Sequence, residues 1–240
     1  IFPPPGKTPR EDTQAVMKFY KLPHSFPQEV LDEAKNVSKR LEKPGKRLDL
    51  RKKYIFTCDP VTARDYDDAI SLETDRAGNV VLGVHIADVS HFVLPDSAID
   101  REAKKRSTSV YFADRVVPML PNELCNGVCS LVPNEDRLAF SVFMTFDKAG
   151  VMIKRSFAKS IIRSKARFTY EQVMRVISSG EKSKDKSVSI QARKTILAVN
   201  KLASLLRAKR FAAGALDIEI PEAEIVLDDN GEMTGIVTRP

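Results

Sequence analysis

The residues with the clearest chemical potential are four aspartates within ten positions of one another: Asp59, Asp65, Asp67 and Asp68. Only Arg64 carries the opposite charge within this stretch. Two carboxylates about 5 Å apart repel by roughly 3 kcal/mol at an effective dielectric constant of about 20, so a cluster of four is costly without a cation. Carboxylate oxygens that leave room for water suit Mg²⁺, and Mn²⁺ is chemically close. The cluster predicts a divalent-metal site, with a solvated acidic loop as the alternative.

The elements around the aspartates predict how they are positioned. An apolar run over residues 54–58 predicts a short strand that delivers Asp59 at its tip. Pro60 interrupts that strand, so the following segment can curl back and bring the other three aspartates near Asp59. A calcium EF-hand loop is excluded, because it needs Gly at its sixth position and Glu at its twelfth, and neither falls in register.

Other chemistries have weaker signals. Gly78 and Gly83 have P-loop spacing, but the residues after Gly83 are not the Lys and Ser or Thr that bind phosphate and metal. No G-x-S-x-G nucleophile elbow is present. His85 and His91 bracket Asp88 and could form a metal pair, although the alternation along a strand favours structural histidines.

Length and composition describe an ordinary globular chain. The 240 residues suffice for one large domain or one and a half. With 42% hydrophobic and 30% charged residues, 10 Gly and 14 Pro, the chain is neither disordered throughout nor collagen-like. Cys58, Cys125 and Cys129 cannot all pair and lack C-x-x-C spacing, which favours a reducing, cytoplasmic setting. No leader and no apolar run of about 20 residues is present, so we expect a piece cut from a longer protein without a membrane partner.

The positive charge of the chain is concentrated in two segments. The chain has 39 Lys and Arg against 32 Asp and Glu, a net charge of +7. Residues 148–170 and 186–216 each contain seven Lys or Arg and no acid, so the remainder is net acidic. Four rings interleave these cations: Phe157, Phe168, Tyr170 and Phe211. The pattern favours a nucleic-acid partner, with phosphates on cations and bases on rings, although either segment alone could be a solvated face.

Hydrophobic periodicity and turn residues predict a mixed α/β fold with a largely antiparallel sheet and helices. Residues 1–22 read as a linker, and Ser25 is predicted to cap a helix, with Gln28 reaching back, that ends at Pro44-Gly45. Hairpins are predicted for 69–74 with 80–86 and for 138–146 with 151–162, and late strands begin near 216 and 225 and surround 229–231. Helices are predicted over 97–107, 169–180 and 189–213, the first two from capping boxes at Ser97 and Thr169.

The aspartate segment and the sequence downstream of it resemble the catalytic RNB domain of the ribonuclease II and ribonuclease R family. The sequence is more similar to bacterial ribonuclease R than to ribonuclease II. The resemblance runs from about residue 20 to the end. It rests on an ordered series: Asp59-Pro-x4-Arg64-Asp65-Tyr-Asp67-Asp68-Ala-Ile70, Gly83-Val-His-Ile-Ala-Asp-Val-Ser90, Thr108-Ser-Val-Tyr-Phe112, Pro118-Met-Leu-Pro121, Asn126-Gly-Val-Cys-Ser-Leu131, Arg137 and Ser164-Lys-Ala-Arg-Phe-Thr-Tyr170. Such a succession is far more specific than any single short motif.

The resemblance implies a processive, hydrolytic 3′-to-5′ exoribonuclease of RNA turnover that releases nucleoside 5′-monophosphates from single-stranded RNA with Mg²⁺. It implies that the four aspartates are metal-binding and catalytic, that Tyr170 assists at the phosphate, and that Tyr111 stacks on a base near the 3′ end. The first turn of a helix after Thr169 suits an anion beside Tyr170. Core packing stays open as an alternative for both tyrosines. For Arg64, Arg167 and Arg137, phosphate contacts and salt bridges to the acidic loop both stay open.

The resemblance also implies parts beyond the chain. The family's RNB domain continues past Pro240 and contributes a further arginine and glutamate, so we expect an RNB catalytic domain that is incomplete at its C-terminus and impaired when isolated. Residues 1–22 would be a linker or the tail of an upstream cold-shock domain, 23–45 a connecting helix and 46–240 the RNB part, with an S1 domain downstream. The alternatives are a catalytically inactive RNA-binding or regulatory relative and a metal-dependent phosphatase for small substrates.

Overall fold

The structure is a computed structural model that describes residues 9–41, 45–180, 187–218, 220–228 and 232–239. The described segments group into two compact units. Unit 1 takes its residues from 1–36, 93–122 and 216–240, and unit 2 from 37–92 and 123–215. Unit 2 contains the four aspartates and Tyr170, whereas Tyr111 belongs to unit 1.

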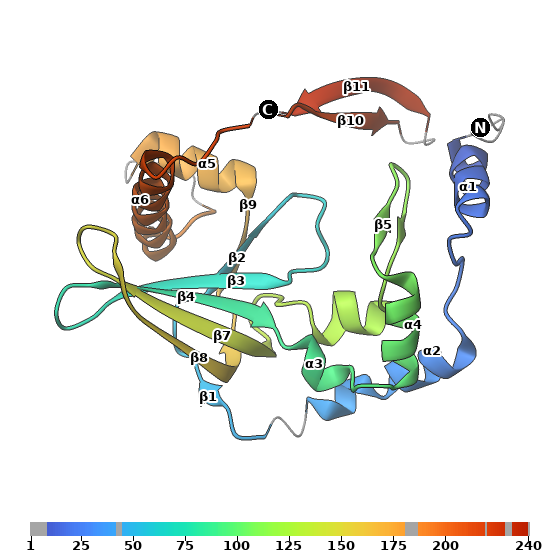
Figure 1. The fold of residues 1–240 in the computed structure, drawn as a ribbon, viewed down its shortest axis with the longest axis horizontal. Helices are drawn as coiled ribbons and strands as arrows, with labels where there is room; N and C mark the ends of the chain where they lie inside the picture. The colour runs from blue at the N-terminus through green and yellow to red at the C-terminus, as the bar shows by residue number, and fades with distance from the viewer. Residues whose placement is uncertain (1–8, 42–44, 181–186, 219, 229–231, 240) are drawn as a thin grey trace. The chain divides into compact units, whose positions relative to one another are not determined.

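Unit 2 is built on a seven-stranded sheet with the order β1-β8-β7-β4-β3-β2-β9 (Figure 1). Its strands are β1 (Leu48–Asp49), β2 (Phe56–Asp59), β3 (Asp68–Thr74), β4 (Val80–Ala87), β7 (Asp136–Phe146), β8 (Met152–Arg163) and β9 (Ala166–Thr169). The pairs β1–β8 and β2–β9 are parallel and the other pairs are antiparallel. The predicted mixed, largely antiparallel sheet is therefore confirmed.

Two predicted hairpins form the centre of this sheet, and an aspartate organises each turn. Asp75 Oδ1 accepts the amides of Ala77 and Asn79 at 2.9 and 2.8 Å. Asp147 Oδ1 accepts in the same way from the amides two and four residues on, at 2.9 and 2.8 Å. Gly150 ends the second turn with φ +70°, and a Cβ there would lie 2.7 Å from a methyl carbon of Leu205. Backbone conformation and packing both require glycine at this position.

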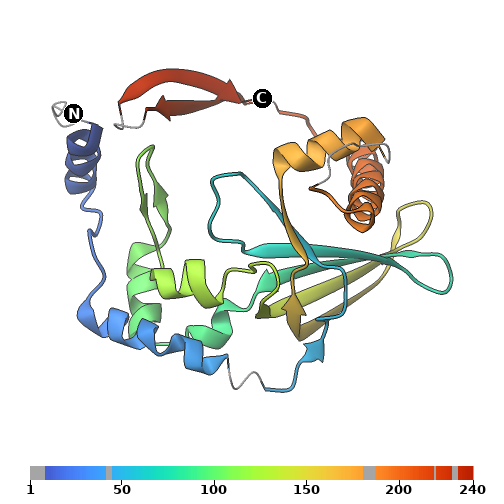
Figure 2. The same cartoon turned by 180° about the vertical axis from the view of Figure 1, so that it is seen from behind.

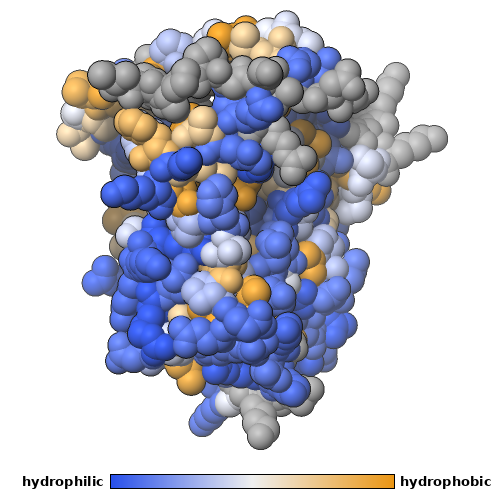
Figure 3. Space-filling view, turned by 90° about the vertical axis from the view of Figure 1, so that its right-hand side faces the viewer, coloured by the Kyte–Doolittle hydropathy of each residue, from blue (hydrophilic) through white to orange (hydrophobic). Residues whose placement is uncertain are grey.

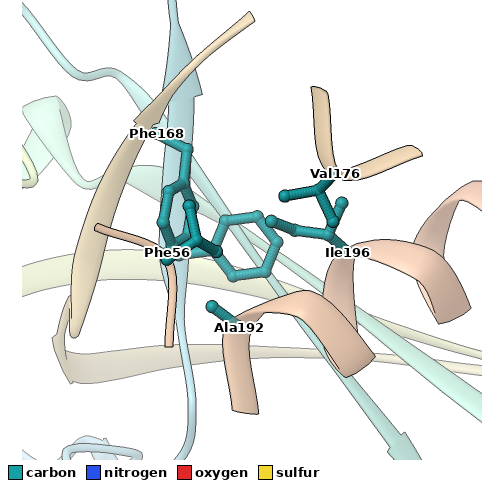
Figure 4. Close-up of a cluster of buried hydrophobic side chains, with 6 residues drawn as sticks. Phe56, Phe168, Val176, Ala192 and Ile196 are labelled. Carbon is teal, nitrogen blue, oxygen red and sulfur yellow. The ribbon is translucent and has the colours of Figure 1, made fainter. Parts of the chain in front are cut away.

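Two helices pack on the sheet and fix its β2–β9 end. They are α5 (Tyr170–Ser179) and α6 (Ile190–Ala212), which lie side by side in Figures 1 and 2. Thr169 forms the predicted capping box with Gln172, and Ser189 Oγ accepts the amide of Ala192 at the start of α6. The buried core between helices and sheet consists of Phe56, Phe168, Val176, Val188, Ala192 and Ile196 (Figure 4). Its two rings lie 5.4 Å apart in an edge-on arrangement.

Short helical segments complete unit 2. They are η1 (Val37–Arg40), α3 (Val89–Phe92) and η2 (Glu123–Val128), the last a π-type turn broken at Gly127. His91 Nε2 donates to the carbonyl of Arg40 in η1 at 2.9 Å, because a carbonyl oxygen can only accept. Asp88 pairs with Arg47 at 2.7 Å, and both side chains are almost fully buried. These contacts agree with structural roles for the His91 and Asp88 side chains.

Unit 1 contains α1 (Pro9–Phe19), α2 (Gln28–Lys35), α4 (Ala98–Arg106) and two small hairpins, β5 (Val110–Tyr111) with β6 (Val116–Val117) and β10 (Glu222–Leu227) with β11 (Met233–Arg239). Arg106 holds much of it together: it stacks over the ring of Phe26 at 3.7 Å, pairs with Glu102 at 2.9 Å and donates to the carbonyls of Ser25 and Pro118. The face shown in Figure 3 is mainly hydrophilic, with hydrophobic residues in small separate groups.

Several local expectations were wrong. Ser25 does not cap the connecting helix. Pro27 precedes α2 without a side-chain cap, and the side-chain amide of Gln28 donates to Asp32. The carbonyl that accepts the first helical amides, those of Val30 and Leu31, belongs to Pro27, so the helix begins two residues after the predicted cap. The Ser25 carbonyl accepts from Arg106. Helix α2 ends at Lys35 rather than near Pro44, which lies outside the described residues, and the helix α1 was not predicted. The first late strand begins at Glu222 rather than near 216, and the turn 229–231 is outside the described part of the chain.

Candidate active site

Asp59 is the last residue of β2 and the most enclosed of the four aspartates. Its relative exposure is 8%, and its Oδ2 is buried with no hydrogen-bond partner among the described residues. Burial is the main cause that raises the pKa of this carboxyl group; the neighbouring charges of Asp68 and Asp65 raise it further, while Thr57 and Arg167 act in the opposite direction. A buried carboxylate oxygen without a donor is costly unless a cation or proton satisfies it.

The other three aspartates come from the loop and strand that follow. Asp65 is half-buried, whereas Asp67 and Asp68 expose part of their surface to solvent. Desolvation of its carboxyl group raises the pKa of Asp67, and the charges of Asp65 and Asp68 add to this effect. Asp65 and Asp68 also act on Asp59, so these two charges reach both the strand tip and the loop. The predicted convergence of all four carboxylates at the end of β2 stays a prediction.

Arg167 of β9 holds the beginning of the loop. One of its terminal nitrogens donates to the carbonyls of Pro60 and Val61 at 2.7 and 3.0 Å. Its guanidinium carbon lies 5.3 Å from the centre of the Tyr66 ring, a cation–π distance. Its Nε is buried without a partner among the described residues. Arg167 therefore binds the backbone of the acidic loop rather than one of its carboxylates.

Ser130 holds the end of the loop from the other side. Its hydroxyl accepts the Tyr66 amide at 3.1 Å and lies 3.3 Å from the Arg64 carbonyl, to which it donates. The Leu131 amide donates to the Tyr66 carbonyl at 2.8 Å. Arg137, 9% exposed, donates from Nε to the Ser130 carbonyl at 2.7 Å and pairs with Glu135 at 2.7 Å. Arg137 thus supports the loop through Ser130, a role that its sequence position did not reveal.

Tyr170 stands beside this cluster. The parallel pairing of β2 with β9 places Thr169 opposite Asp59, so the next residue begins α5 at the edge of the site. Its side chain is 52% exposed, which disfavours core packing as its role. Burial of part of the ring raises the pKa of Tyr170, and the charges of Cys58, Asp59 and Asp68 raise it further. The phenol therefore remains protonated and lies within the electrostatic reach of Asp59 and Asp68.

The two other predicted RNA-contact residues, Arg64 and Tyr111, both have exposed side chains. Arg64 is exposed in the loop, next to Asp65. Tyr111 lies in β5 of unit 1, opposite Val116, and is 67% exposed. This exposure argues against the alternative in which Tyr111 is a core residue.

Sequence reasoning missed the residues that surround the aspartates from other elements. Cys58 lies within the field of Asp59, Asp68 and Glu171, and burial followed by these charges raises its pKa to about 11. Burial likewise raises the pKa of Cys129 to about 12. These thiols stay protonated near neutral pH, which makes them poor nucleophiles and poor metal ligands. Glu171 is a further carboxylate beside the site, and its position directly after Tyr170 was the available signal.

The donor set fits a hard divalent cation. The four groups are carboxylates, one of them presents a buried oxygen without a partner among the described residues, and burial, helped by neighbouring negative charges, raises the pKa of Asp59 and Asp67. Across the described ranges, no three Asp, Glu, His or Cys side chains form a ready-made metal cage. Asp59, Asp65, Asp67 and Asp68 are the residues that could hold an ion.

Comparison with known proteins decides the family. Residues 47–240 match the family model described as the RNB domain. The chain belongs to the RNB family. It is 42% identical over 257 residues to ribonuclease R of Thermotoga maritima, covering 99% of this chain and 36% of that protein. It is 44% identical over 200 residues to DIS3-like exonuclease 2 of Schizosaccharomyces pombe, covering 79% of this chain and 21% of that protein.

Solved structures agree with this assignment. RNase R of Mycoplasma genitalium, in complex with ribose-methylated single-stranded RNA, matches with a TM-score of 0.88 at 32% identity, over 98% of this chain and 36% of that one. Yeast Ssd1, described as a pseudonuclease, shares the fold with a TM-score of 0.59 at 22% identity, over 71% of this chain and 20% of that one. The chain thus spans about a third of the length of the ribonuclease R proteins that it matches. None of the described helices is long and apolar enough to span a bilayer.

Proposed function

We propose that this RNB chain supplies the carboxylate centre of a Mg²⁺-dependent, hydrolytic 3′-to-5′ exoribonuclease that degrades single-stranded RNA to nucleoside 5′-monophosphates in the cytoplasm. The observation that carries the proposal is the buried Asp59 oxygen without a hydrogen-bond partner among the described residues, within reach of the charges of Asp65 and Asp68. Membership of the RNB family supports it, as does the similarity to proteins named ribonuclease R, one of them solved with RNA. Cold-shock and S1 domains in the remainder of a longer protein would bind the RNA.

Each residue has a role in this proposal. The four aspartates hold Mg²⁺, or Mn²⁺ in its place, and the ion when bound neutralises the scissile phosphate and activates water. Tyr170 donates its phenolic proton in a hydrogen bond to a phosphate oxygen, because its raised pKa keeps the hydroxyl protonated. Arg64 contacts the phosphates, and Tyr111 stacks on a base, an interaction of about 1 to 3 kcal/mol.

An Asp67→Asn substitution tests the carboxylate centre. In a full-length protein that carries this chain, we expect the variant to degrade a 5′-labelled single-stranded RNA about 100-fold more slowly or worse, because one anionic metal ligand is lost. Degradation is followed on a denaturing gel, where stepwise shortening from the 3′ end distinguishes an exonuclease from a phosphatase. Asp32→Asn is the matched control, since this carboxylate lies on the exposed surface of α2.

The second candidate is an RNA-binding relative without catalysis. The pseudonuclease that shares this fold and the lack of a ready-made metal cage among the described residues favour it. Equal rates for the Asp67→Asn variant and the parent would leave that candidate standing and remove the nuclease proposal.

A further inference from the structure

Two exposed aromatic side chains lie next to each other on β7 and β8, on the sheet face that carries Phe56 but outside the buried cluster beneath α5 and α6. Phe140 of β7 is 41% exposed and Phe157 of β8 is 59% exposed. Their ring centres are 6.4 Å apart and the ring planes differ by 33°, so both rings face solvent in nearly the same orientation. Neither ring belongs to the buried cluster that holds α5 and α6 on the sheet.

The strand register places this pair on the same face of the sheet as Asp68. Across neighbouring strands, Asp68 lies opposite Ile86, Ile86 opposite Phe140, and Phe140 opposite Lys159. Phe157 lies opposite Val142, two residues along β7 from Phe140, and therefore on that face as well. Ile86 is 44% exposed, so the row from Asp68 to Lys159 is an open surface. Phe140 lies two strand spacings, about 10 Å, from Asp68.

The same face carries two cations, one on either side of Phe157 along β8. Along β8, the residues that share the face of Phe157 are Arg155 and Lys159, and both are exposed. Lys159 also lies in the field of Asp88, although Asp88 is already paired with Arg47. Within the described part of the chain, the outer edge of β8 pairs with β1 at Ser160 and Ile161, and the part of the strand that carries Phe157 has no neighbouring strand on that side (Figure 1).

We propose that Phe140, Phe157, Arg155 and Lys159 form a platform for single-stranded RNA. Bases stack on the two rings while phosphates contact the two cations, which is how antiparallel sheets with exposed aromatic and basic residues bind single strands. A buried protein interface would place apolar residues at 155 and 159, because desolvating two unpaired cations is costly. The direction of the strand, with its 3′ end toward Asp68, rests on the proposed function; the platform itself does not.

The experiment measures binding of a fluorescent single-stranded RNA of about 12 nucleotides to the chain, by anisotropy in EDTA so that hydrolysis does not interfere. We expect Phe157→Ala to weaken binding about 5-fold or more, and Phe157→Trp to retain it, because stacking needs an aromatic face. Both substitutions are at an exposed position, so circular dichroism should show an unchanged fold.

A pair of lysine substitutions distinguishes RNA binding at the platform from attraction by the overall positive charge of the chain. Lys154 and Lys159 are both exposed on β8, but Lys154 lies opposite Thr145 and therefore on the other face. We expect Lys159→Ala to lower the slope of log affinity against log salt concentration by about one and Lys154→Ala to change it little. Equal effects of the two lysine variants, or unchanged affinity in Phe157→Ala, would overturn the platform.

A full-length protein that carries this chain provides the last readout. Lys159 should be modified by an amine-reactive reagent without RNA and protected when RNA is added; protection without RNA would mean that a protein segment covers this face, and would overturn the proposal. Failure of the nuclease proposal is recognised separately: Asp67→Asn would then leave RNA degradation unchanged, whatever Phe157→Ala does to affinity.

Discussion

The two ends of the unit 2 sheet are built for opposite purposes. At the β2–β9 end, two four-residue strands pair in parallel, helices α5 and α6 cover Phe56 and Phe168, and an aspartate is buried at a strand tip. At the β7–β8 end, strands of 11 and 12 residues form a long antiparallel hairpin whose rings and cations face solvent. Burial at the first end positions charges and raises their free energy, whereas exposure at the second leaves groups available to bind a polyanion.

The difference predicts unequal tolerance to loss of a ring. Phe168→Ala should lower the free energy of unfolding by about 3 to 5 kcal/mol, because it removes a 3% exposed ring from the core and leaves a cavity. Phe157→Ala, the matched change at the open end, should cost well under 1 kcal/mol. Urea denaturation of both variants measures this, and similar losses would contradict the assignment of the two ends.

A buried histidine at the centre of the sheet, His85, makes the stability of unit 2 depend on pH. His85 hydrogen-bonds with Ser71 at 3.0 Å and Ser141 at 2.7 Å, and burial lowers its pKa to about 4. The unfolded chain takes up this proton near pH 6.5. Stability should therefore fall as the pH drops from about 6.5 to about 4, by up to about 3 kcal/mol, and be unaffected by this group above that window.

The variant His85→Gln should lose that part of the pH dependence, measured by urea denaturation across the window. His24→Gln is the control, because this histidine is exposed in unit 1. An identical pH profile for wild type and His85→Gln would show that His85 is not buried in its neutral form.

The positioning of the acidic loop offers a third way to test the β2–β9 end. Arg167→Met removes the donors to Pro60 and Val61, and the shifted loop should slow RNA degradation by a full-length protein about 100-fold, mainly in kcat. Arg163→Met, at the end of β8 on the other side of the sheet, removes an exposed contact with Asp136 and serves as the control. If Arg167→Met raised KM without lowering kcat, Arg167 would be an RNA contact instead.

The smallest effect is expected at the edge of the open end. Asp136 contacts Arg163 and Arg51 at 2.7 and 3.1 Å, but all three side chains are at least one-third exposed. Asp136→Asn should therefore change the free energy of unfolding by less than about 1 kcal/mol, and the difference should vanish in high salt. A larger loss would mean that the stability of the β7–β8 end depends on its ion pairs.

Local signals in the sequence predicted much of this molecule. Asp75 and Asp147 with their following glycines located both central hairpins, and Thr169 located the start of α5. The same kind of signal failed at Ser25, since the helix begins only after Pro27 and the Ser25 carbonyl accepts from Arg106, 81 positions away. Ser130 was missed as a support of the loop because the Tyr66 amide that it accepts lies 64 positions away. Arg137, for which the sequence left phosphate contact and a salt bridge open, donates to the Ser130 carbonyl.

The chain's own order of residues determined which groups are present and how they repeat: four aspartates around a proline, two hairpin turns, and a strand with alternating rings and cations. These follow from interactions within a few residues, which propensity and spacing describe. Only the tertiary structure decided that Asp59 is buried without a donor, that Arg167 binds backbone rather than carboxylate, and that Asp68 and Phe157 share a face. Desolvation and strand register depend on segments far apart in the chain, so no local pattern contains them.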